Sequence, residues 1–595
     1  MSTHADRLVA LRETLAATKL TGFVVPLTDE HMSEYVGEYA QRLAWLTGFE
    51  GSAGAAVVLA DKAAMFTDGR YTLQVRAQVD GDLYDYISVP ETPTTDWLAV
   101  NVKAGDRIGY DPWLHTKGWV TATAKVLDER GAALVAQAEN PVDRVWTARP
   151  APSGAVLEVH DEALAGQSSA DKRAAVAGWL AERRADAVVI SALDSLAWLF
   201  NIRGRDVART PVALAFAIVH ADASADLYVA PDKVTDTVRA HLGDAVRVHP
   251  RDDFADALES YAGKSALADP ASAVAAIFER LAAGGAKVTE LRDPCVLAKA
   301  VKNTVEVAGT KAAHLRDGAA LTRFLHWFDG AAAGGELDEM AAAAKLRQFR
   351  DATNQLEDLS FDTISGAGPN GAIVHYRVSE ATNRRIEKDS LFLLDSGGQY
   401  KDGTTDVTRT MAVGTPTPEM RDRFTRVLKG HIAVARAVFP KGTRGGQLDV
   451  LARLPLWEVG LDYAHGTGHG VGSYLSVHEG PQRIATVIGT GGEEPLMPGM
   501  ILSDEPGYYK TGEYGIRIEN LVLVVERAVA GAEKPMYGFE TLTLAPIDRK
   551  LIDATMLTDD ERGWVDAYHA RVAAEVGPLL DEVQSAWLKT MTAPL

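Results

Sequence analysis

The chain has 595 residues, of which 47% are hydrophobic and 24% charged, a composition that excludes a disordered or fibrous protein. At ~150 residues per domain, this length predicts several domains. The 61 lysine and arginine residues are outnumbered by 81 aspartate and glutamate residues, which gives a formal net charge of −20. So acidic a chain repels phosphate groups, and we therefore expect neither a nucleic-acid partner nor binding to an anionic membrane.

The cysteine content and the N-terminal sequence predict a cytoplasmic protein. Cys295 is the single cysteine, which excludes an intrachain disulfide, and no Asn-x-Ser/Thr glycosylation sequence is present. Both features are typical of a reducing compartment. The first residues contain no apolar stretch of signal-peptide length. The longest apolar run, residues 211–219, is much shorter than the ~20 residues of a membrane span and is interpreted as a buried strand.

Two segments in the first half repeat one order of elements. Each begins with a helix and a strand, continues with the sequence Leu-Ala-Trp-Leu, and ends with two strands. The expected elements are 8–19, 22–26, 43–48, 55–59 and 63–67 in the first copy, and 172–184, 187–191, 196–199, 212–219 and 225–229 in the second. Trp45 and Trp198 occupy matching places. A chance recurrence is the alternative, but the matching order favours a duplicated α/β domain.

Breaker residues predict three domains, at residues 1–154, 155–300 and 301–595. Residues 149–154, Arg-Pro-Ala-Pro-Ser-Gly, form a linker, and Asp293-Pro294 marks the second boundary. Apolar residues then recur at helical spacing over 296–332. Thr417-Pro418 begins another helix, with threonine as N-cap and proline at the first helical position, and this helix is expected to run to about Phe439. The third domain alternates strands and helices.

A first pair of carboxylates lies in a predicted hairpin. Asp395 ends the apolar run 391–395, and Asp406 lies in a segment of alternating character over 402–411. Residues 400–403, Tyr-Lys-Asp-Gly, predict the turn between them. A hairpin would bring Asp395 and Asp406 together, and two buried carboxylates are costly unless a cation neutralises them. A solvent-exposed hairpin with surface aspartates is the alternative.

A second pair of carboxylates follows further along the chain. Glu505 ends the apolar strand 500–504, and Glu519 lies inside a predicted strand over 516–525, on the same face as Arg517. A solvated face does not explain charged residues within so apolar a strand. A buried salt bridge is the alternative, but it leaves Glu505 and both aspartates unexplained.

Histidines lie between the two pairs. His465 and His469 belong to the glycine-rich run His-Gly-Thr-Gly-His-Gly-Val-Gly, and His478 follows. A lone histidine is more often structural, but three in a segment that permits close backbone approach favour function. The run lacks the glutamate of a zinc His-Glu-x-x-His helix.

The two pairs of carboxylates and one histidine form an oxygen-rich set. The four negative charges of the two aspartates and two glutamates would be neutralised by two divalent cations. Such an oxygen-rich set favours manganese over a thiolate-type zinc site, and paired metals lie ~3.5–4 Å apart.

These motifs together resemble aminopeptidase P, the Xaa-Pro aminopeptidases of the pita-bread metallopeptidase superfamily. The resemblance covers nearly the whole chain and points to the long, three-domain cytosolic type. The matching segments in the last domain are Asp395-Ser-Gly-Gly398, Thr405-Asp-Val-Thr-Arg409, His465-Gly-Thr-Gly-His469, Asp504-Glu-Pro-Gly-Tyr508 and Gly515-Ile-Arg-Ile-Glu-Asn520. Those in the first two domains are Phe49-Glu-Gly-Ser-Ala-Gly54, Phe66-Thr-Asp-Gly-Arg-Tyr71 and Ser195-Leu-Ala-Trp-Leu-Phe-Asn-Ile-Arg-Gly204. The implied fold is two related N-terminal α/β domains followed by a pita-bread catalytic domain.

The resemblance also implies roles for individual residues. Asp395 would bind one metal and His469 with Glu505 the other, while Asp406 and Glu519 would bridge the two. Glu505 matches the residue assigned as general base. The residues expected to bind substrate are Arg70, His375, His469, His478 and Arg517. His375 and His478 would in addition be catalytic, by polarising the scissile carbonyl or stabilising the intermediate. His465 and Arg517 match positions where structural support is an equally good interpretation.

The implied reaction removes the N-terminal residue from peptides with proline at the second position. A hydroxide activated by two divalent metals would attack the carbonyl carbon, with manganese favoured and zinc or cobalt as alternatives. The C-terminal tail, residues 539–545 and 564–568, resembles that of dimeric members of the family and carries several apolar groups, so the resemblance implies a homodimer. A prolidase, restricted to Xaa-Pro dipeptides, is the main alternative, and methionine aminopeptidase and the metal-free creatinase fit less well. A metal-free pita-bread binding module, such as a histone chaperone domain, is the alternative outside enzymes.

Overall fold

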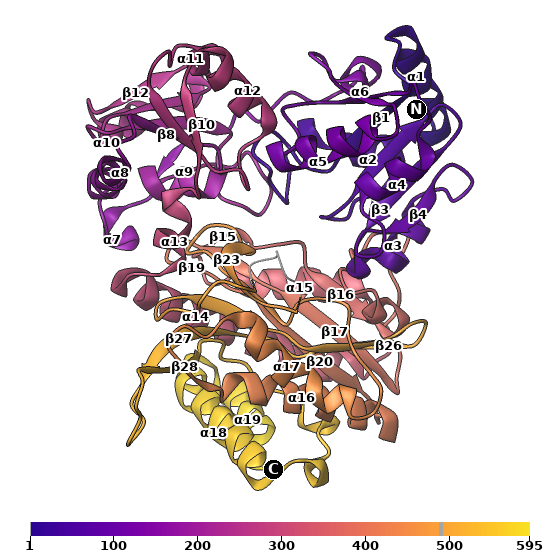
Figure 1. Ribbon diagram of the computed structural model, residues 1–595. Coiled ribbons are helices and arrows are strands. Elements are labelled where there is room, and N and C mark those ends of the chain that lie inside the picture. The colour runs from indigo at the N-terminus through magenta and orange to yellow at the C-terminus, as the bar shows by residue number, and fades with distance from the viewer. Residues whose placement is uncertain (1, 487–491) are drawn as a thin grey trace. The chain divides into compact units, whose positions relative to one another are not determined.

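The computed structural model describes residues 2–486 and 492–595, which form two compact units (Figure 1). Unit 1 comprises Met1–Glu162 and Gln167–Val296, and unit 2 comprises Ala163–Gly166 and Leu297–Leu595. Unit 1 includes the first predicted domain and most of the second, without residues 163–166 and 297–300, and the predicted boundaries at residues 154 and 300 stay predictions.

Unit 1 contains two six-stranded sheets of the same plan. The first has the order β4-β3-β2-β1-β5-β6 and the second has β12-β11-β10-β8-β13-β14. In each sheet the first strand in sequence pairs antiparallel with the second and the second with the third, whereas the remaining pairs are parallel. The repeated order of elements predicted from the sequence is therefore confirmed. Trp45 and Trp198 lie on the matching helices α2 (Arg42–Thr47) and α9 (Leu193–Phe200).

The elements of unit 1 have the following bounds. The strands of the first sheet are β1 Gly22–Pro26, β2 Ala55–Leu59, β3 Ala63–Thr67, β4 Asp85–Ser88, β5 Arg107–Tyr110 and β6 Ala133–Ala136. Those of the second are β8 Ala187–Ile190, β10 Ala215–His220, β11 Ala225–Val229, β12 Val246–His249, β13 Ser265–Ala268 and β14 Lys287–Glu290. The accompanying helices are α1 His4–Ala17, α3 Thr72–Gln78, α4 Thr94–Asn101, α5 Lys117–Asp128, α6 Pro141–Val145, α8 Ser169–Arg183, α10 Asp236–Leu242, α11 Phe254–Glu259 and α12 Ala275–Ala283. A short pair joins β7 Glu158–Val159 to β9 Ile202–Arg203. The short helix α7 (Glu162–Ala165) lies almost wholly in the segment Ala163–Gly166, which belongs to unit 2.

Unit 2 is built on several antiparallel sheets with helices against them. Two three-stranded sheets have the orders β15-β18-β19 and β16-β17-β20, one six-stranded sheet has β21-β28-β27-β24-β22-β23, and β25 pairs with β26. The strands are β15 Leu356–Leu359, β16 Ile364–Ala367, β17 Ser390–Ser396, β18 Gly398–Tyr400, β19 Gly403–Thr404, β20 Val407–Val413, β21 Val438–Pro440, β22 Gly468–Gly470, β23 Glu479–Ile484, β24 Ile501–Asp504, β25 Gly507–Lys510, β26 Tyr514–Arg517, β27 Asn520–Arg527 and β28 Met536–Thr541. The helices are α14 Thr304–Ala332, α15 Glu339–Asp351, α16 Pro418–Ala435, α17 Gly445–Trp457, α18 Asp559–Val576 and α19 Glu582–Met591, and α13 (Pro294–Ala300) precedes them.

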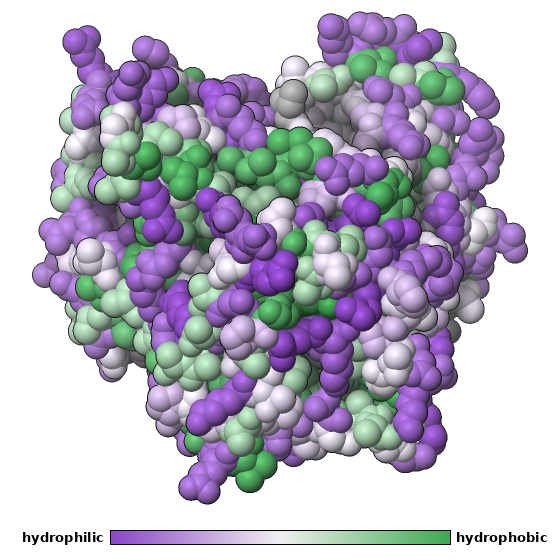
Figure 2. All heavy atoms as spheres, turned by 90° about the horizontal axis from the view of Figure 1, so that it is seen from below, coloured by the Kyte–Doolittle hydropathy of each residue, from purple (hydrophilic) through white to green (hydrophobic). Residues whose placement is uncertain are grey.

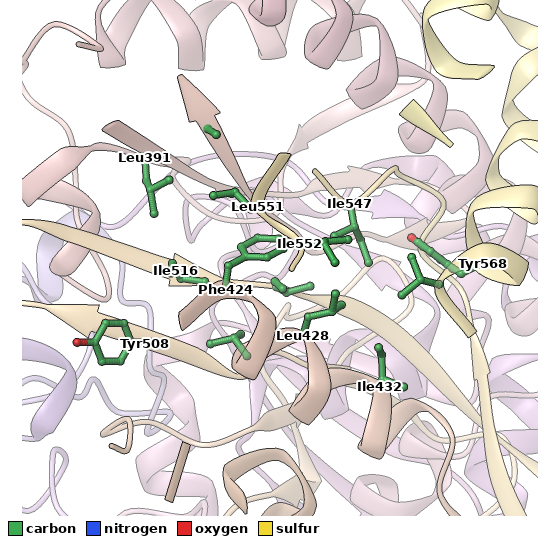
Figure 3. Close-up of a cluster of buried hydrophobic side chains, with 14 of the residues drawn as sticks. Leu391, Phe424, Leu428, Ile432, Tyr508, Ile516, Ile547, Leu551, Ile552 and Tyr568 are labelled. Carbon is green, nitrogen blue, oxygen red and sulfur yellow. The ribbon is translucent and has the colours of Figure 1, made fainter. Parts of the chain in front are cut away.

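Several hydrophobic cores hold the helices of unit 2 against its strands. In one of them, Phe424, Leu428 and Ile432 of α16 pack with Ile516 of β26 and with residues near the C-terminus (Figure 3). In another, apolar residues of α14 and α15 pack on β16, β17 and β20. Fully burying one such side chain contributes ~1.5–3 kcal/mol, so these cores fix the strands that carry the candidate site.

Several predicted elements have different bounds in the structure. In unit 1 the helix expected over 8–19 is α1 (His4–Ala17), and the strand expected over 212–219 begins only at Ala215. The helix expected over 296–332 is interrupted before Thr304, where Asn303 caps α14 and accepts hydrogen bonds from two backbone amides. The helix beginning at Pro418 ends at Ala435 rather than near Phe439. The strand expected over 516–525 is interrupted at residues 518–519, between β26 and β27. Glu519 therefore lies in the break, directly before β27, and not inside a strand.

Among the described residues, no helix is both long and apolar enough to cross a bilayer. Seen from below relative to Figure 1, the surface is largely hydrophilic, with hydrophobic residues in smaller groups between the polar ones (Figure 2). Scattered apolar residues of this kind are normal on protein surfaces.

Candidate metal centre

The predicted hairpin is present and brings the first two carboxylates together. β17 pairs antiparallel with β20, so that Asp395 lies opposite Thr408, and Asp406 precedes β20 by one residue. The short pair β18 and β19 lies between them and includes the predicted turn. Asp395 and Asp406 are 7% and 4% exposed, which rules out the alternative of surface aspartates. Thr408 is also buried, and its hydroxyl donates to Glu519 Oε2 at 2.9 Å.

Glu519 and Glu505 come from neighbouring strands of the large sheet. Glu505 follows β24 and Glu519 precedes β27, and these two strands pair antiparallel with Asp504 opposite Asn520. The register therefore places the two glutamates at the same end of the strand pair. Glu519 is 1% exposed.

His469 joins the carboxylates from β22, which pairs with β24. Its Nε2 atom lies 3.6 Å from Asp406 Oδ2 and 3.5 Å from Glu505 Oε1. Asp406, His469 and Glu519 each offer a ligand atom within 4.8 Å of the others, and all three residues are buried. The structure thus gathers these predicted ligands in one place.

Arg517 is the cation that contacts Asp395. Its Nη2 atom donates to Asp395 Oδ2 at 2.7 Å, and its Nη1 atom donates to the Tyr509 hydroxyl at 2.6 Å. Arg517 therefore forms a buried salt bridge, but with Asp395, one of the aspartates that the salt-bridge alternative left unexplained. It accounts for one carboxylate oxygen of the cluster and leaves Asp406, Glu505 and Glu519 without that cation as a hydrogen-bonded partner.

The chemistry of the cluster fits divalent cations. Asp395 Oδ1 and Asp406 Oδ1 are buried and have no hydrogen-bond partner among the described residues. Burial, followed by the neighbouring carboxylates, raises the pKa of Asp406 and of Glu519 well above the ordinary range. Burial also raises the pKa of Glu505 to about 7. Buried carboxylates with lone pairs to spare are the donors that hard and borderline divalent cations prefer.

The residues expected to bind substrate lie in different parts of the chain. His478 is half-buried and its ring packs edge-on against His469, with 4.3 Å between ring centroids. His375 is half-buried on the segment after β16, where Arg517 Nη1 donates to the backbone oxygen of Val374 at 3.3 Å. The His478 ring therefore contacts a predicted ligand, and the backbone next to His375 is hydrogen-bonded to Arg517.

Arg70 lies in unit 1. Its Nη2 atom lies 2.8 Å from Asp68 Oδ2 and its Nη1 atom 3.8 Å from Glu34 Oε1. Its predicted role in binding substrate stays a prediction.

Several supporting residues were missed by the sequence reasoning. The Tyr509 hydroxyl contacts both Arg517 and His465 Nε2, the latter at 2.8 Å, so His465 supports the arginine rather than the carboxylates. Thr408 shares a face with Asp406 in the alternating segment, and that alternation was the signal that could have identified it. The residues that fix the glycine-rich loop, Asp449 and Arg453, lie on α17 and carried no local signal.

The raised pKa of Glu505 predicts how the cation-free protein responds to pH. A carboxyl whose pKa rises from its ordinary value of 4.5 to about 7 on folding favours the folded state below pH ~4.5, and this contribution is lost as pH rises through ~7. We expect the free energy of unfolding of chelator-treated protein to fall over that interval by on the order of 3 kcal/mol more in the wild type than in Glu505→Gln. Denaturant unfolding at pH 5 and 7.5 measures the difference. The exposed Glu526→Gln is the control, and equal pH dependence in all three proteins would contradict the assignment.

Comparisons with known families define the class of protein. Metallopeptidase family M24 matches residues 308–526, and the C-terminal region of peptidase M24 matches residues 535–595. The creatinase/prolidase N-terminal domain matches twice, at residues 7–145 and 148–306. This is a metallopeptidase of the M24 class with two creatinase-type domains before the catalytic domain, which confirms the predicted fold class.

Individual relatives narrow the class to one family. A probable Xaa-Pro aminopeptidase P of Aspergillus fumigatus is 43% identical, covering 99% of this chain and 92% of the relative, and one of Aspergillus niger is 42% identical, covering 99% of each. The chain belongs to the Xaa-Pro aminopeptidase P family, as predicted. A crystal structure of X-prolyl aminopeptidase from Caenorhabditis elegans, described as a cytosolic enzyme with a di-nuclear active site, is 35% identical with a TM-score of 0.95 and covers 100% of both chains. The dipeptidase PepE of Mycobacterium ulcerans is 26% identical with a TM-score of 0.51, covering 98% of that chain but 65% of this one.

Proposed function

We propose that this chain is a metal-dependent aminopeptidase that releases the N-terminal residue from peptides with proline in the second position. The observation that carries the proposal is the buried cluster of Asp406, His469 and Glu519, in a chain similar over its full length to aminopeptidases P. The metal-free alternatives would not require four carboxylates to gather in one place with two of their buried oxygens, Asp395 Oδ1 and Asp406 Oδ1, lacking a hydrogen-bond partner among the described residues.

We assign the cluster to two divalent cations. Asp395 would bind the first cation, and His469 and Glu505 would bind the second. Asp406 and Glu519 would each bind both cations. Manganese suits the oxygen-rich donor set, with zinc or cobalt as alternatives. Such ions would polarise the scissile carbonyl and supply a water-derived nucleophile at neutral pH. Arg517 orients Asp395, and Thr408 orients Glu519, through the hydrogen bonds described above.

The chain's own residues would handle the protons and the substrate. Glu505, with its pKa near 7 in the cation-free protein, is suited to take a proton from water and pass it to the leaving amine. His478 and His375 would donate hydrogen bonds to the carbonyl oxygen as it gains negative charge. Arg70 would contact the substrate from the N-terminal half. The tertiary amide and fixed φ of proline make the Xaa–Pro bond a poor substrate for general peptidases.

The experiment that tests this function compares two peptides. The protein is stripped of metal with a chelator, reloaded with manganese and assayed with Arg-Pro-Pro and with the dipeptide Gly-Pro. Release of arginine from the tripeptide, lost on chelation and restored by manganese, supports an aminopeptidase P. Hydrolysis of the dipeptide alone would instead indicate a prolidase. No metal-dependent release from either peptide would contradict both functions.

We also propose that the protein is located in the cytoplasm, because its single cysteine cannot form an intrachain disulfide.

We also propose a homodimer formed through the C-terminal domain. The tail residues that suggested a dimer mostly pack inside the subunit, since Phe539, Val565 and Tyr568 are buried. An exposed apolar stripe lies instead on one face of α17, where Leu454 and Trp457 are 50% and 42% exposed. Association would remove this stripe from water.

We expect light scattering at micromolar concentration to give twice the 63.8 kDa mass of one chain. The double variant Leu454→Ser, Trp457→Ser should shift the protein towards the monomer, because it removes the apolar contact. Val9→Ser, at an exposed valine of α1, is the control and should leave the mass unchanged. A wild-type monomer would contradict the proposed assembly.

A further inference from the structure

The chain enters unit 2 through residues 297–303, and this segment is bonded to the strand that leads to Glu505. The Lys302 amide donates to the Gly499 oxygen at 2.9 Å, and Val301 pairs with Met500, which directly precedes β24. Gly499 has φ of +97°, and a Cβ atom there would lie 2.9 Å from the Lys302 oxygen. The close approach therefore depends on glycine.

Two lysines of the same segment meet one buried glutamate. Lys302 Nζ lies 2.5 Å from Glu479 Oε1, and Lys299 Nζ lies 3.3 Å from Glu479 Oε2. The side chains of Lys302, Lys299 and Glu479 are 1%, 3% and 0% exposed. Burying an ion costs several kcal/mol even after relaxation, and two ammonium groups share one carboxylate here. Stability alone is therefore a poor explanation of this arrangement.

Glu479 directly follows His478 and is bound to the loop that carries His469. It begins β23 and lies opposite Gly470 of β22. A Cβ atom at Gly472 would lie 3.1 Å from Glu479 Oε2, so the carboxylate packs against the glycine-rich loop. Two kinds of contact thus fix the backbone of Glu479. Its side chain is paired with the two lysines, and its backbone is paired with β22.

We propose that Lys302 and Glu479 are positioning residues for His478. The ion pair holds the Glu479 backbone, and hence the neighbouring His478, at the place where the imidazole packs on His469. This inference rests on the proposed function, in which His478 contacts the scissile carbonyl oxygen. Residues 297–303 would then influence the active site indirectly, through Glu479 and His478, and not through a contact between either lysine and a candidate metal ligand.

The test is Lys302→Met in the full-length, manganese-loaded enzyme. This change leaves Lys299 opposite Glu479, so one cation still faces one carboxylate. We expect kcat for Arg-Pro-Pro to fall about tenfold or more, with KM and bound metal unchanged, because small displacements of a reacting group cost up to ~10²-fold in rate. In a His478→Ala background the same change should lower kcat no further, since residues acting through one another are not additive.

Lys233→Met is the matched control. Lys233 in unit 1 is equally buried, and its Nζ atom lies 2.5 Å from Asp206 Oδ2, so its loss lowers the melting temperature without moving His478. If Lys302→Met does not fold, Glu479→Asp keeps the charge and shortens the side chain, and should show the same loss of kcat. An undiminished kcat, or an equal loss in the His478→Ala background, overturns the positioning role. An inactive wild-type enzyme would overturn the proposed function itself.

Discussion

Asp406→Asn and Glu519→Gln are each expected to abolish activity and to lower the metal content of the purified protein. Asp406 Oδ1 has no protein partner among the described residues, and Asp406 and Glu519 both lie within reach of His469. In the proposed function each of the two carboxylates would hold both cations. Removing one charge from such a position should exceed the ~10–100-fold effects typical of residues that only support ligands. Metal analysis and kinetics on Arg-Pro-Pro measure both results.

Asp402→Asn provides the control for these variants. Asp402 lies in the same hairpin, between β18 and β19, but pairs with Arg316 rather than with the cluster. The control should keep two metals and near wild-type turnover. If Asp406→Asn or Glu519→Gln behaves like the control, the assignment of a dinuclear centre is wrong.

His478→Ala is expected to lower kcat by at least a hundredfold, with little change in KM or bound metal. A hydrogen bond that strengthens as the carbonyl oxygen becomes charged acts mainly on the transition state. Losing one such donor typically costs ~10²–10³ in rate, or ~2.7–4 kcal/mol. Steady-state kinetics, a metal assay and a melting curve on the same preparations give the three quantities.

His569→Ala shows what a purely structural histidine would do. His569 is fully buried, and its Nε2 atom accepts a hydrogen bond from the Ile547 amide at 3.0 Å. Its loss should lower the melting temperature and leave kcat of the folded enzyme nearly unchanged. If His478→Ala gives that same pattern, His478 is structural, and the mechanism loses a donor to the carbonyl oxygen.

Local patterns predicted the elements whose character is decided nearby in the chain. The strands at 22–26, 55–59 and 63–67 were predicted with the observed bounds, because short apolar runs between turn residues define them. The helix at Pro418 began where its threonine cap predicted. The hairpin of Asp395 and Asp406 also followed from alternation and a turn sequence.

Features that depend on distant pairing could not be predicted in this way. The break at residues 518–519 lies inside an apolar run that is typical of one strand, and it arises because β26 pairs with β25 while β27 pairs with β24 and β28. Tyr509 and Arg453 support the site from elements far apart in sequence. Side-chain contacts of this kind depend on how strands and helices pack, which periodicity does not specify.

The candidate ligands are spread from Asp395 to Glu519, on strands that meet only through long-range pairing. An unfolded chain therefore cannot present them to a cation together, in contrast to a metal site made by neighbouring residues. The cation consequently binds the folded state and not the unfolded state. Binding adds RT ln(1 + [L]/Kd) to the free energy of unfolding, where [L] is the free cation concentration and Kd its dissociation constant. A cation at a thousand times its dissociation constant would contribute about 4 kcal/mol, so metal supply would affect the stability of the folded enzyme as well as its activity.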